Sequence, residues 1–263
     1  MNLNDISTQL LYTTVPIWVQ RADGRQSFGT AFYYAVAIPD QPGRQVPFIV
    51  TNFHVVDGAT RAVFELVERS GDAPKGGARV RVEMPGDAIV RHSNSSIDIA
   101  AIPVGGVLSG LEQTGKPVFF RSIGPEIIPS EAALAELSAI EDVTFIGYPS
   151  GLYDEHNATP LVRRGITATP PWNNFRGQDA FLVDAGVFPG SSGSPVFILN
   201  QGAYATKDGI SLGNRLLFMG VLSEAILRAE PNVPNVYLGL GKVVKSAAIR
   251  DFLHPLAAKL AKG

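Results

Sequence analysis

The stretch whose residues are best suited to catalysis runs from residue 188 to residue 196 and reads Phe-Pro-Gly-Ser-Ser-Gly-Ser-Pro-Val. Ser192 stands there between Gly190 and Gly193. A serine nucleophile needs a tight turn that presents its hydroxyl, with backbone N–H groups aimed at the oxyanion that develops on the attacked carbonyl. Because Gly190 tolerates backbone conformations that larger residues avoid, the N–H groups of Gly190 and Ser192 are the candidate oxyanion donors. An ordinary Gly/Ser turn between strands is the alternative interpretation.

A serine becomes nucleophilic only beside a base, and the base needs a group that orients it. His54 is the candidate base, because it ends the apolar run 48–53 at what should be the rim of a strand. Asp98 is the candidate acid, because it directly precedes the apolar run 99–103, where an unpaired carboxylate would be costly to bury. Taken singly, His54 could be a core histidine and Asp98 a turn or capping residue. Together the three residues follow the order of chymotrypsin-type enzymes rather than that of subtilisins or α/β-hydrolases.

The elements that must position these residues are predicted to be short strands. The 27 glycines and 19 prolines separate apolar runs of four to nine residues, a texture typical of an all-β protein. Alternation of apolar and charged residues is clearest over 78–83. The predicted strands form two series, the first at 16–21, 27–38, 47–51, 62–68, 78–84, 88–91 and 99–103, the second at 142–147, 161–169, 180–184, 195–199, 216–223 and 236–240.

Two helices are expected around these series. The stretch 104–140 has no strand pattern and holds one helix candidate, Ser130–Leu137, with Ser130 as its N-cap. The segment Ser246–Lys259 has apolar residues at helical spacing, which predicts an amphipathic helix packed on the body, kinked or restarted by Pro255. The resulting division is an N-terminal unit at 1–120 carrying the histidine and aspartate, a connector at 121–141, a unit at 142–245 carrying the serine, and a C-terminal helix at 246–263.

Composition removes several functional classes. The 263 residues include no cysteine, which excludes disulfides, thiolate nucleophiles and cysteine-bound metals. The net charge of −2 without charged blocks predicts neither nucleic-acid nor membrane binding. No basic segment precedes the first apolar patch, and no apolar run approaches the ~20 residues of a membrane span. A cytoplasmic location without signal peptide is the resulting expectation.

Three motifs carry a family resemblance. Thr51-Asn52-Phe53-His54, Asp98-Ile99-Ala100 and Gly190-Ser191-Ser192-Gly193-Ser194-Pro195 are similar to the histidine, aspartate and serine motifs of trypsin-like peptidases. The bacterial HtrA/DegP-type branch is the nearer likeness, through Asp184-Ala185 eight residues before the serine and through the turn 146–151. The likeness spans roughly residues 15–250.

This resemblance implies two six-stranded antiparallel β-barrels, with a short inter-barrel helix, a C-terminal helix and an active site between the barrels. It implies a serine endopeptidase with His54, Asp98 and Ser192 as its triad and no cofactor. Ser191 replaces the aspartate that pairs with a newly cut N-terminus in digestive trypsins, so no activation of that kind is expected. The PDZ domain usual in HtrA proteins is not expected.

The specificity pocket is assigned by the same analogy. Gly186 stands six residues before the serine, where trypsins place an aspartate, and the pocket walls should come from Val221, Leu222, Ser223 and Gly239. These small or apolar residues predict cleavage after small or medium apolar side chains. Glu224 or Asp184 could intrude and favour a basic residue instead.

Other interpretations stay open. The chain could be a non-catalytic protein-binding module on a protease fold, or a serine esterase. His92 and His156 are expected in solvated loops, and no metal site is predicted. A protein or peptide is the expected substrate, and access could be controlled by a loop at 149–160 or 172–179 or by a regulatory partner protein.

Overall fold

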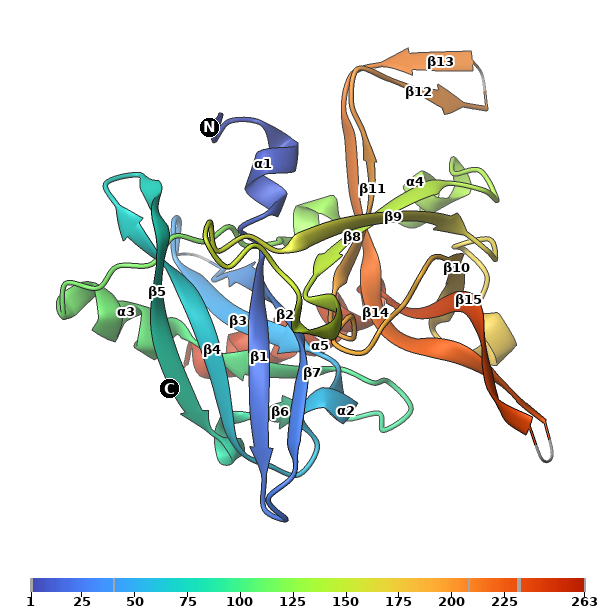
Figure 1. Ribbon diagram of the computed structural model, residues 1–263. Coiled ribbons are helices and arrows are strands. Elements are labelled where there is room, and N and C mark those ends of the chain that lie inside the picture. The colour runs from blue at the N-terminus through green and yellow to red at the C-terminus, as the bar shows by residue number, and fades with distance from the viewer. Residues whose placement is uncertain (1, 40, 208, 231–232, 263) are drawn as a thin grey trace.

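The N-terminal half is one antiparallel sheet in the computed structural model, which describes every residue except 1, 40, 208, 231–232 and 263 (Figure 1). The strand order is β5-β4-β1-β2-β3-β7-β6. The alternation read at 78–83 lies in β5, which pairs with β4. The strands are β1 (Thr14–Arg21), β2 (Gln26–Ala37), β3 (Gln45–Thr51), β4 (Ala59–Ser70), β5 (Ala73–Pro85), β6 (Val90–Arg91) and β7 (Ala100–Pro103).

The C-terminal half is a closed six-stranded barrel in the order β10-β15-β14-β11-β8-β9. A separate two-stranded hairpin, β12 (Ala203–Thr206) with β13 (Gly209–Leu212), projects from it (Figure 1). The barrel strands are β8 (Asp142–Gly147), β9 (Leu161–Thr167), β10 (Ala180–Asp184), β11 (Pro195–Asn200), β14 (Arg215–Glu230) and β15 (Val233–Lys245).

The expected pair of closed barrels is therefore present only in part. The C-terminal half forms a closed barrel as predicted. The seven strands of the N-terminal half form a sheet whose two edge strands are β5 and β6. The short helical turn η1 (Gly86–Ala88) interrupts the chain between β5 and β6, and β6 is only two residues long. A strand that short forms just two register pairs, both with β7, and contributes no pairing to β5.

Most of the helices are short, and α5 is the longest of those described. Those of the α type are α1 (Ile6–Leu10), α2 (Phe53–Val56), α3 (Gly105–Gln113), α4 (Glu131–Ala135) and α5 (Ser246–Leu260), and the further 3-10 turns are η2 (Pro125–Ile127), η3 (Pro149–Gly151) and η4 (Phe175–Gly177). The hydroxyl of Ser130 accepts the N–H of Ala133, as expected of the N-cap of α4. Helix α3 was not predicted, and α5 does not restart at Pro255, which is exposed. No helix of the described residues is long and apolar enough to cross a membrane.

The described residues form three apolar clusters, one of which joins the two halves. One fills the N-terminal sheet, with Ile17 and Phe64 fully buried, and one fills the C-terminal barrel. The third lies between them and joins Phe32 of β2 to Phe218 of β14, whose rings are 5.5 Å apart. Helix α5 packs Ile249 and its apolar neighbours onto this third cluster. Burial of this shared core therefore fixes the position of one half relative to the other.

Candidate active site

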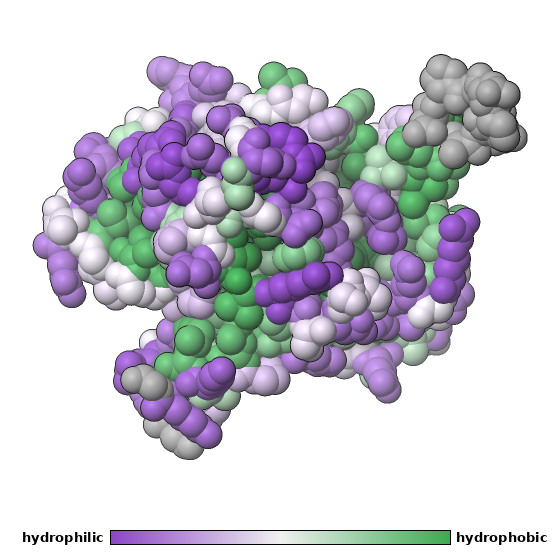
Figure 2. Space-filling view, turned by 90° about the horizontal axis from the view of Figure 1, so that it is seen from below, coloured by the Kyte–Doolittle hydropathy of each residue, from purple (hydrophilic) through white to green (hydrophobic). Residues whose placement is uncertain are grey.

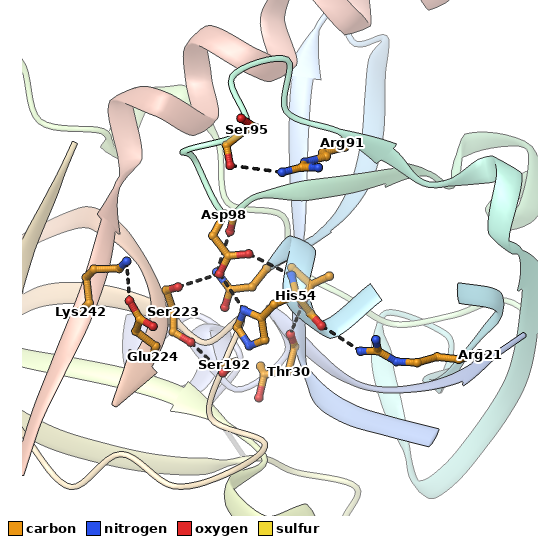
Figure 3. Close-up of polar contacts among 12 residues, drawn as sticks. Arg21, Thr30, His54, Arg91, Ser95, Asp98, Ser192, Ser223, Glu224 and Lys242 are labelled. Atoms are coloured by element: carbon orange, nitrogen blue, oxygen red, sulfur yellow. Dashed lines mark hydrogen bonds and ion pairs between the residues drawn. The ribbon is translucent and has the colours of Figure 1, made fainter. Parts of the chain in front are cut away.

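His54 and Asp98 form a directly bonded pair in the N-terminal half. His54 lies in the single turn of α2, which begins where β3 ends. Its ring Nδ1 is 2.7 Å from Asp98 Oδ2, and its backbone N–H donates to Asp98 Oδ1 at 2.9 Å (Figure 3). The Nδ1 contact orients the imidazole ring. Because an ionised carboxylate only accepts hydrogen bonds, we assign the proton to Nδ1, which leaves Nε2 as the acceptor nitrogen.

Asp98 is held by further groups from both halves. The amide of the fully buried Asn52 donates to the Asp98 backbone carbonyl at 2.9 Å. The hydroxyl of Ser223, from β14 of the other half, donates to Asp98 Oδ2 at 2.7 Å. Burial alone would raise the pKa of the Asp98 carboxyl, but the hydrogen bonds and charge of His54 and the Ser223 hydroxyl outweigh it, so the pKa is lowered. Asp98 is therefore an anion at neutral pH.

Ser192 lies in the turn before β11, next to this pair. Its hydroxyl donates to the backbone carbonyl of Ser223 at 2.8 Å (Figure 3). A hydroxyl has one proton to donate, so in this arrangement it is not given to His54. Rotation about the Cα–Cβ bond of Ser192 is the movement that would redirect it towards the imidazole.

Gly190 adopts a positive-φ backbone conformation, which favours glycine. Its φ is 86°, and the Ser191 N–H donates to the Phe188 carbonyl at 2.9 Å, which closes a tight turn over Pro189 and Gly190. The Pro189 carbonyl accepts the N–H of Ser150 at 2.6 Å. In a trans peptide the C=O and N–H groups point in opposite directions, so the Gly190 N–H is turned away from Ser150. Among the described residues, neither this N–H nor that of Ser192 donates to a protein acceptor.

Thr30 of β2 ties the serine turn to the N-terminal sheet. Its N–H donates to the Ser192 carbonyl at 2.9 Å, and its hydroxyl donates to the Gly190 carbonyl at 2.8 Å while accepting the Tyr148 N–H at 3.0 Å. The approach is close enough that a Cβ on Gly193, whose φ is 90°, would lie 1.8 Å from the Thr30 carbonyl oxygen. The serine turn therefore depends on contacts from both halves.

Comparison with known proteins identifies the family of this chain. The sequence model of the trypsin-like peptidase domain matches residues 29–204, more than half of the chain. The chain belongs to this family. The predicted resemblance to trypsin-like peptidases is thereby confirmed, and HtrA-type proteases are among the solved structures that share the fold. No curated protein sequence matches this peptidase domain significantly.

Solved structures show the fold that this trypsin-like peptidase domain shares. An alanine variant of the HtrA-type protease AlgW, solved with a tripeptide, has a TM-score of 0.54 at 15% identity, covering 98% of this chain and 64% of that chain. The chain thus spans less than two thirds of AlgW. HL collagenase has a TM-score of 0.53 at 16% identity, with coverage of 95% and 94%. The scabies mite inactivated protease paralogue S-I1 has a TM-score of 0.50 at 12% identity, with coverage of 94% and 95%.

A cleft of about 500 Å³ opens beside Ser192 in this peptidase domain. Its apolar wall lies mainly on the turn before Ser192 and on the β14–β15 hairpin, and Figure 2 shows hydrophobic atoms on that hairpin beside the grey tip. The lining residues are His54, Val187, Phe188, Pro189, Ser192, Ser223, Glu224, Ala225, Leu227 and Tyr237.

Of the five residues expected to line a specificity pocket, only Ser223 does so. Val221 and Leu222 are fully buried in the apolar clusters, because β14 pairs with both β11 and β15 at that level. Gly186 lies behind the wall, where a Cβ would meet the Arg163 guanidinium at 2.6 Å, and Gly239 is likewise outside the lining. The sequence did not single out four apolar or aromatic residues of this lining, Phe188, Ala225, Leu227 and Tyr237. Phe188 could have been found as the apolar residue next to the serine motif, and Ala225 and Leu227 as the continuation of the strand beyond Ser223. Tyr237 lies on β15, and no sequence signal connects it to the cleft.

The remaining polar candidates lie apart from the reacting groups. Glu224 borders the cleft but pairs with Lys242 at 2.5 Å, whereas Asp184 does not line it. The His92 ring accepts the N–H of Asn94 at 3.0 Å, within its own loop. His156 is exposed. In the described part of the chain, no group of three or more His, Asp and Glu could hold a metal ion.

Proposed function

We propose that this chain is a serine endopeptidase in which Ser192, His54 and Asp98 form the catalytic triad. The observation that carries the proposal is the 2.7 Å contact between His54 Nδ1 and Asp98 Oδ2, with the Ser192 hydroxyl beside them on the other half. This is the set of groups that acyl transfer needs: a nucleophile, a base and an acid that orients the base.

Peptide hydrolysis would proceed by transfer of the Ser192 hydroxyl proton to His54 and from there to the leaving amine. Ser192 turns its hydroxyl from the Ser223 carbonyl to His54 Nε2 and attacks the peptide carbonyl, while His54 takes the proton. Asp98 stabilises the imidazolium, and the Gly190 and Ser192 N–H groups stabilise the oxyanion. His54 then returns the proton to the leaving amine, and water repeats the sequence on the acyl-enzyme.

The cleft supports a preference for small or medium apolar side chains before the scissile bond. Its wall beside Ser192 is built from Val187, Phe188, Ala225 and Leu227, and its nearest carboxylate, Glu224, is neutralised by Lys242. Burying a charged substrate group against such a wall without a partner would be unfavourable. A profile of cleaved peptides tests this preference.

Labelling with a fluorescent fluorophosphonate tests the triad directly, because the probe reacts with an activated serine whatever the substrate. Wild type should label, and Ser192→Ala and His54→Ala should not. Ser194→Ala is the matched control, since the Ser194 hydroxyl is buried in the same turn without a hydrogen-bond partner; it should label like wild type. A folded wild-type protein that stays unlabelled would contradict the proposal and favour a binding module, a state the inactivated paralogue of the same fold makes physically reasonable. Cleavage of esters but not of peptides would favour an esterase.

A further inference from the structure

Tyr237 connects the β14–β15 hairpin to the segment that leads into the serine turn. Its hydroxyl donates to the Ala185 carbonyl at 2.9 Å and accepts the backbone N–H of Val187. Its ring lines the cleft, with its centroid 6.4 Å from that of Phe188. One side chain therefore contacts both the backbone that supports the serine turn and the space beside Ser192.

The segment that Tyr237 contacts is held by apolar packing, because Ala185 and Val187 belong to the apolar cluster of the C-terminal barrel, and by a few hydrogen bonds. Ala185 and Val187 are buried, so their backbone polar groups need protein partners. Besides the two hydrogen bonds of the Tyr237 hydroxyl, the Ala185 N–H donates to the Gly239 carbonyl at 2.9 Å. Tyr237 and Gly239 both belong to β15. The hairpin strand thus supplies the hydrogen bonds that hold residues 185–187.

This segment leads directly to the oxyanion turn. Val187 precedes Phe188, and the Phe188 carbonyl accepts the Ser191 N–H that closes the turn around Gly190. A displacement of Val187 therefore moves the turn that orients the Gly190 N–H. Because an oxyanion donor acts only at 2.7–3.1 Å from the oxyanion, a small displacement is enough to weaken it.

We propose that Tyr237 is a positioning and specificity-determining residue of this site. Its hydroxyl holds residues 185–187 so that the Gly190 N–H stays in place, and its ring limits the size of the side chain that the cleft accepts. The inference rests on the proposed peptidase function for its effect on rate, whereas the hydrogen bonds of the hydroxyl can be tested without any activity.

Tyr237→Phe separates the hydroxyl from the ring. It should lower kcat and the rate of fluorophosphonate labelling about tenfold or more, leave KM within about twofold, and leave the side-chain preference unchanged. Hydrogen exchange measured by mass spectrometry should become about tenfold faster in a peptide covering residues 185–191, because the Val187 N–H loses its acceptor. Tyr204→Phe is the matched control, since Tyr204 lies on β12 away from the cleft; it should change none of these quantities.

Tyr237→Ala removes the ring as well. Tyr237→Ala should show the same loss of kcat as Tyr237→Phe. In addition, the ratio of kcat/KM for substrates with Phe before the scissile bond to that for substrates with Val should be at least about tenfold higher than in wild type. A purely structural role for Tyr237 would lower the melting temperature and leave the ratio of the two substrates unchanged, which would contradict the inference.

The outcomes separate the two proposals. The positioning role is wrong if Tyr237→Phe has the wild-type rate of hydrogen exchange at residues 185–191 and the wild-type kcat. It is also wrong if hydrogen exchange becomes faster while kcat does not change. If wild type fails to label, the peptidase proposal falls, and the exchange rates at 185–191 still decide whether the Tyr237 hydroxyl holds the segment. Equal exchange in wild type and Tyr237→Phe would overturn the inference in that case too.

Discussion

The two sides of the cleft hold their groups in different ways. On the N-terminal side, His54 and Asp98 bind one another through two hydrogen bonds, and each follows directly from an apolar strand or precedes one. On the C-terminal side, Ser192 lies in a turn held by Thr30 of the opposite half and by residues 185–187, which Tyr237 contacts. The base and acid thus bind each other directly, with Ser223 of the other half as a further partner of Asp98, whereas the nucleophile is placed mainly by backbone contacts with distant parts of the chain.

This difference predicts where the site is robust and where it is fragile. Substitutions on the His54 side should remove chemistry and leave the fold intact, because the pair is partly exposed and adds little to the core. Substitutions that disturb the serine turn should affect folding and activity together, because that turn lies between the two halves.

Asp98→Asn tests the local side with the largest expected effect on rate. The amide would present an N–H to the imidazole and favour the wrong tautomer, so kcat should fall about 10⁴-fold. The melting temperature should fall only slightly, because the lost carboxylate is a partly exposed group that adds little to the core. Steady-state kinetics and thermal unfolding measure the two quantities. Asp179→Asn is the control, because the Asp179 carboxylate accepts from Asn174 rather than from the histidine. A loss of tenfold or less would mean that Asp98 does not orient the base.

Gly193→Ala tests the fragile side. The new Cβ would lie 1.8 Å from the Thr30 carbonyl oxygen at a backbone φ of 90°, so the turn and the sheet must separate. The free energy of unfolding in urea should fall by about 3 kcal/mol or more. Gly24→Ala, with a φ of 81° and no atom within 4 Å of its Cβ, should lose only about 1 kcal/mol. Equal losses would show that the contact with Thr30 is unimportant.

Thr30→Val probes the same contact from the other half while keeping the side-chain shape. It removes the hydroxyl that donates to the Gly190 carbonyl and accepts the Tyr148 N–H, leaving two buried polar groups without a partner. The free energy of unfolding should fall by about 2 kcal/mol, and the rate of fluorophosphonate labelling should fall with it. Thr60→Val, which removes an exposed hydroxyl bound to Gln20, should change both by much less.

The same contrast decides what the sequence could reveal. Strands at 142–147 and 180–184 were predicted with their observed bounds, since each is an apolar run bounded by polar or turn residues. The motifs around His54, Asp98 and Ser192 were visible because each needs particular residues at short spacing, and the structure brings these three side chains together. The oxyanion role of Gly190 remains a proposal, supported by its positive φ.

Features fixed by long-range contacts could not be read in this way. Ser223 was expected in the wall of the specificity pocket, and the structure places it in the lining of the cleft. That its hydroxyl also bonds Asp98 depends on the packing of the two halves. Helix α3 begins with Gly105 and Gly106, which disfavour a helix, yet Leu108 and Leu111 pack on the N-terminal core. Strand β14 was expected to end at Ser223 and continues to Glu230, because β15 pairs with it beyond the barrel.

Ser223→Ala tests the contact that joins the two sides. Loss of the hydroxyl should lower kcat about tenfold and raise the pKa of Asp98. The Asp98 pKa is lowered in the folded protein, so its carboxylate stabilises the fold above the ordinary value of 3.8, and that contribution is lost as the pH falls through the folded-state pKa. In Ser223→Ala this contribution should be smaller, and its loss should be complete at a higher pH than in wild type. Urea unfolding between pH 3 and pH 7 measures it, and identical pH profiles would contradict the role of Ser223.

The smallest expected effect concerns charge at the mouth of the cleft. Glu224 is about half exposed and pairs with Lys242, and an exposed pair of this kind is worth at most about 1 kcal/mol. Glu224→Gln should therefore change cleavage after Arg or Lys, relative to Val, by less than about fivefold. Lys242→Met leaves Glu224 unpaired and should raise the relative cleavage after basic residues several-fold. If wild type already cleaves mainly after Arg or Lys and Glu224→Gln abolishes this, Glu224 rather than the apolar wall determines specificity, and the C-terminal side of the cleft selects substrates by charge.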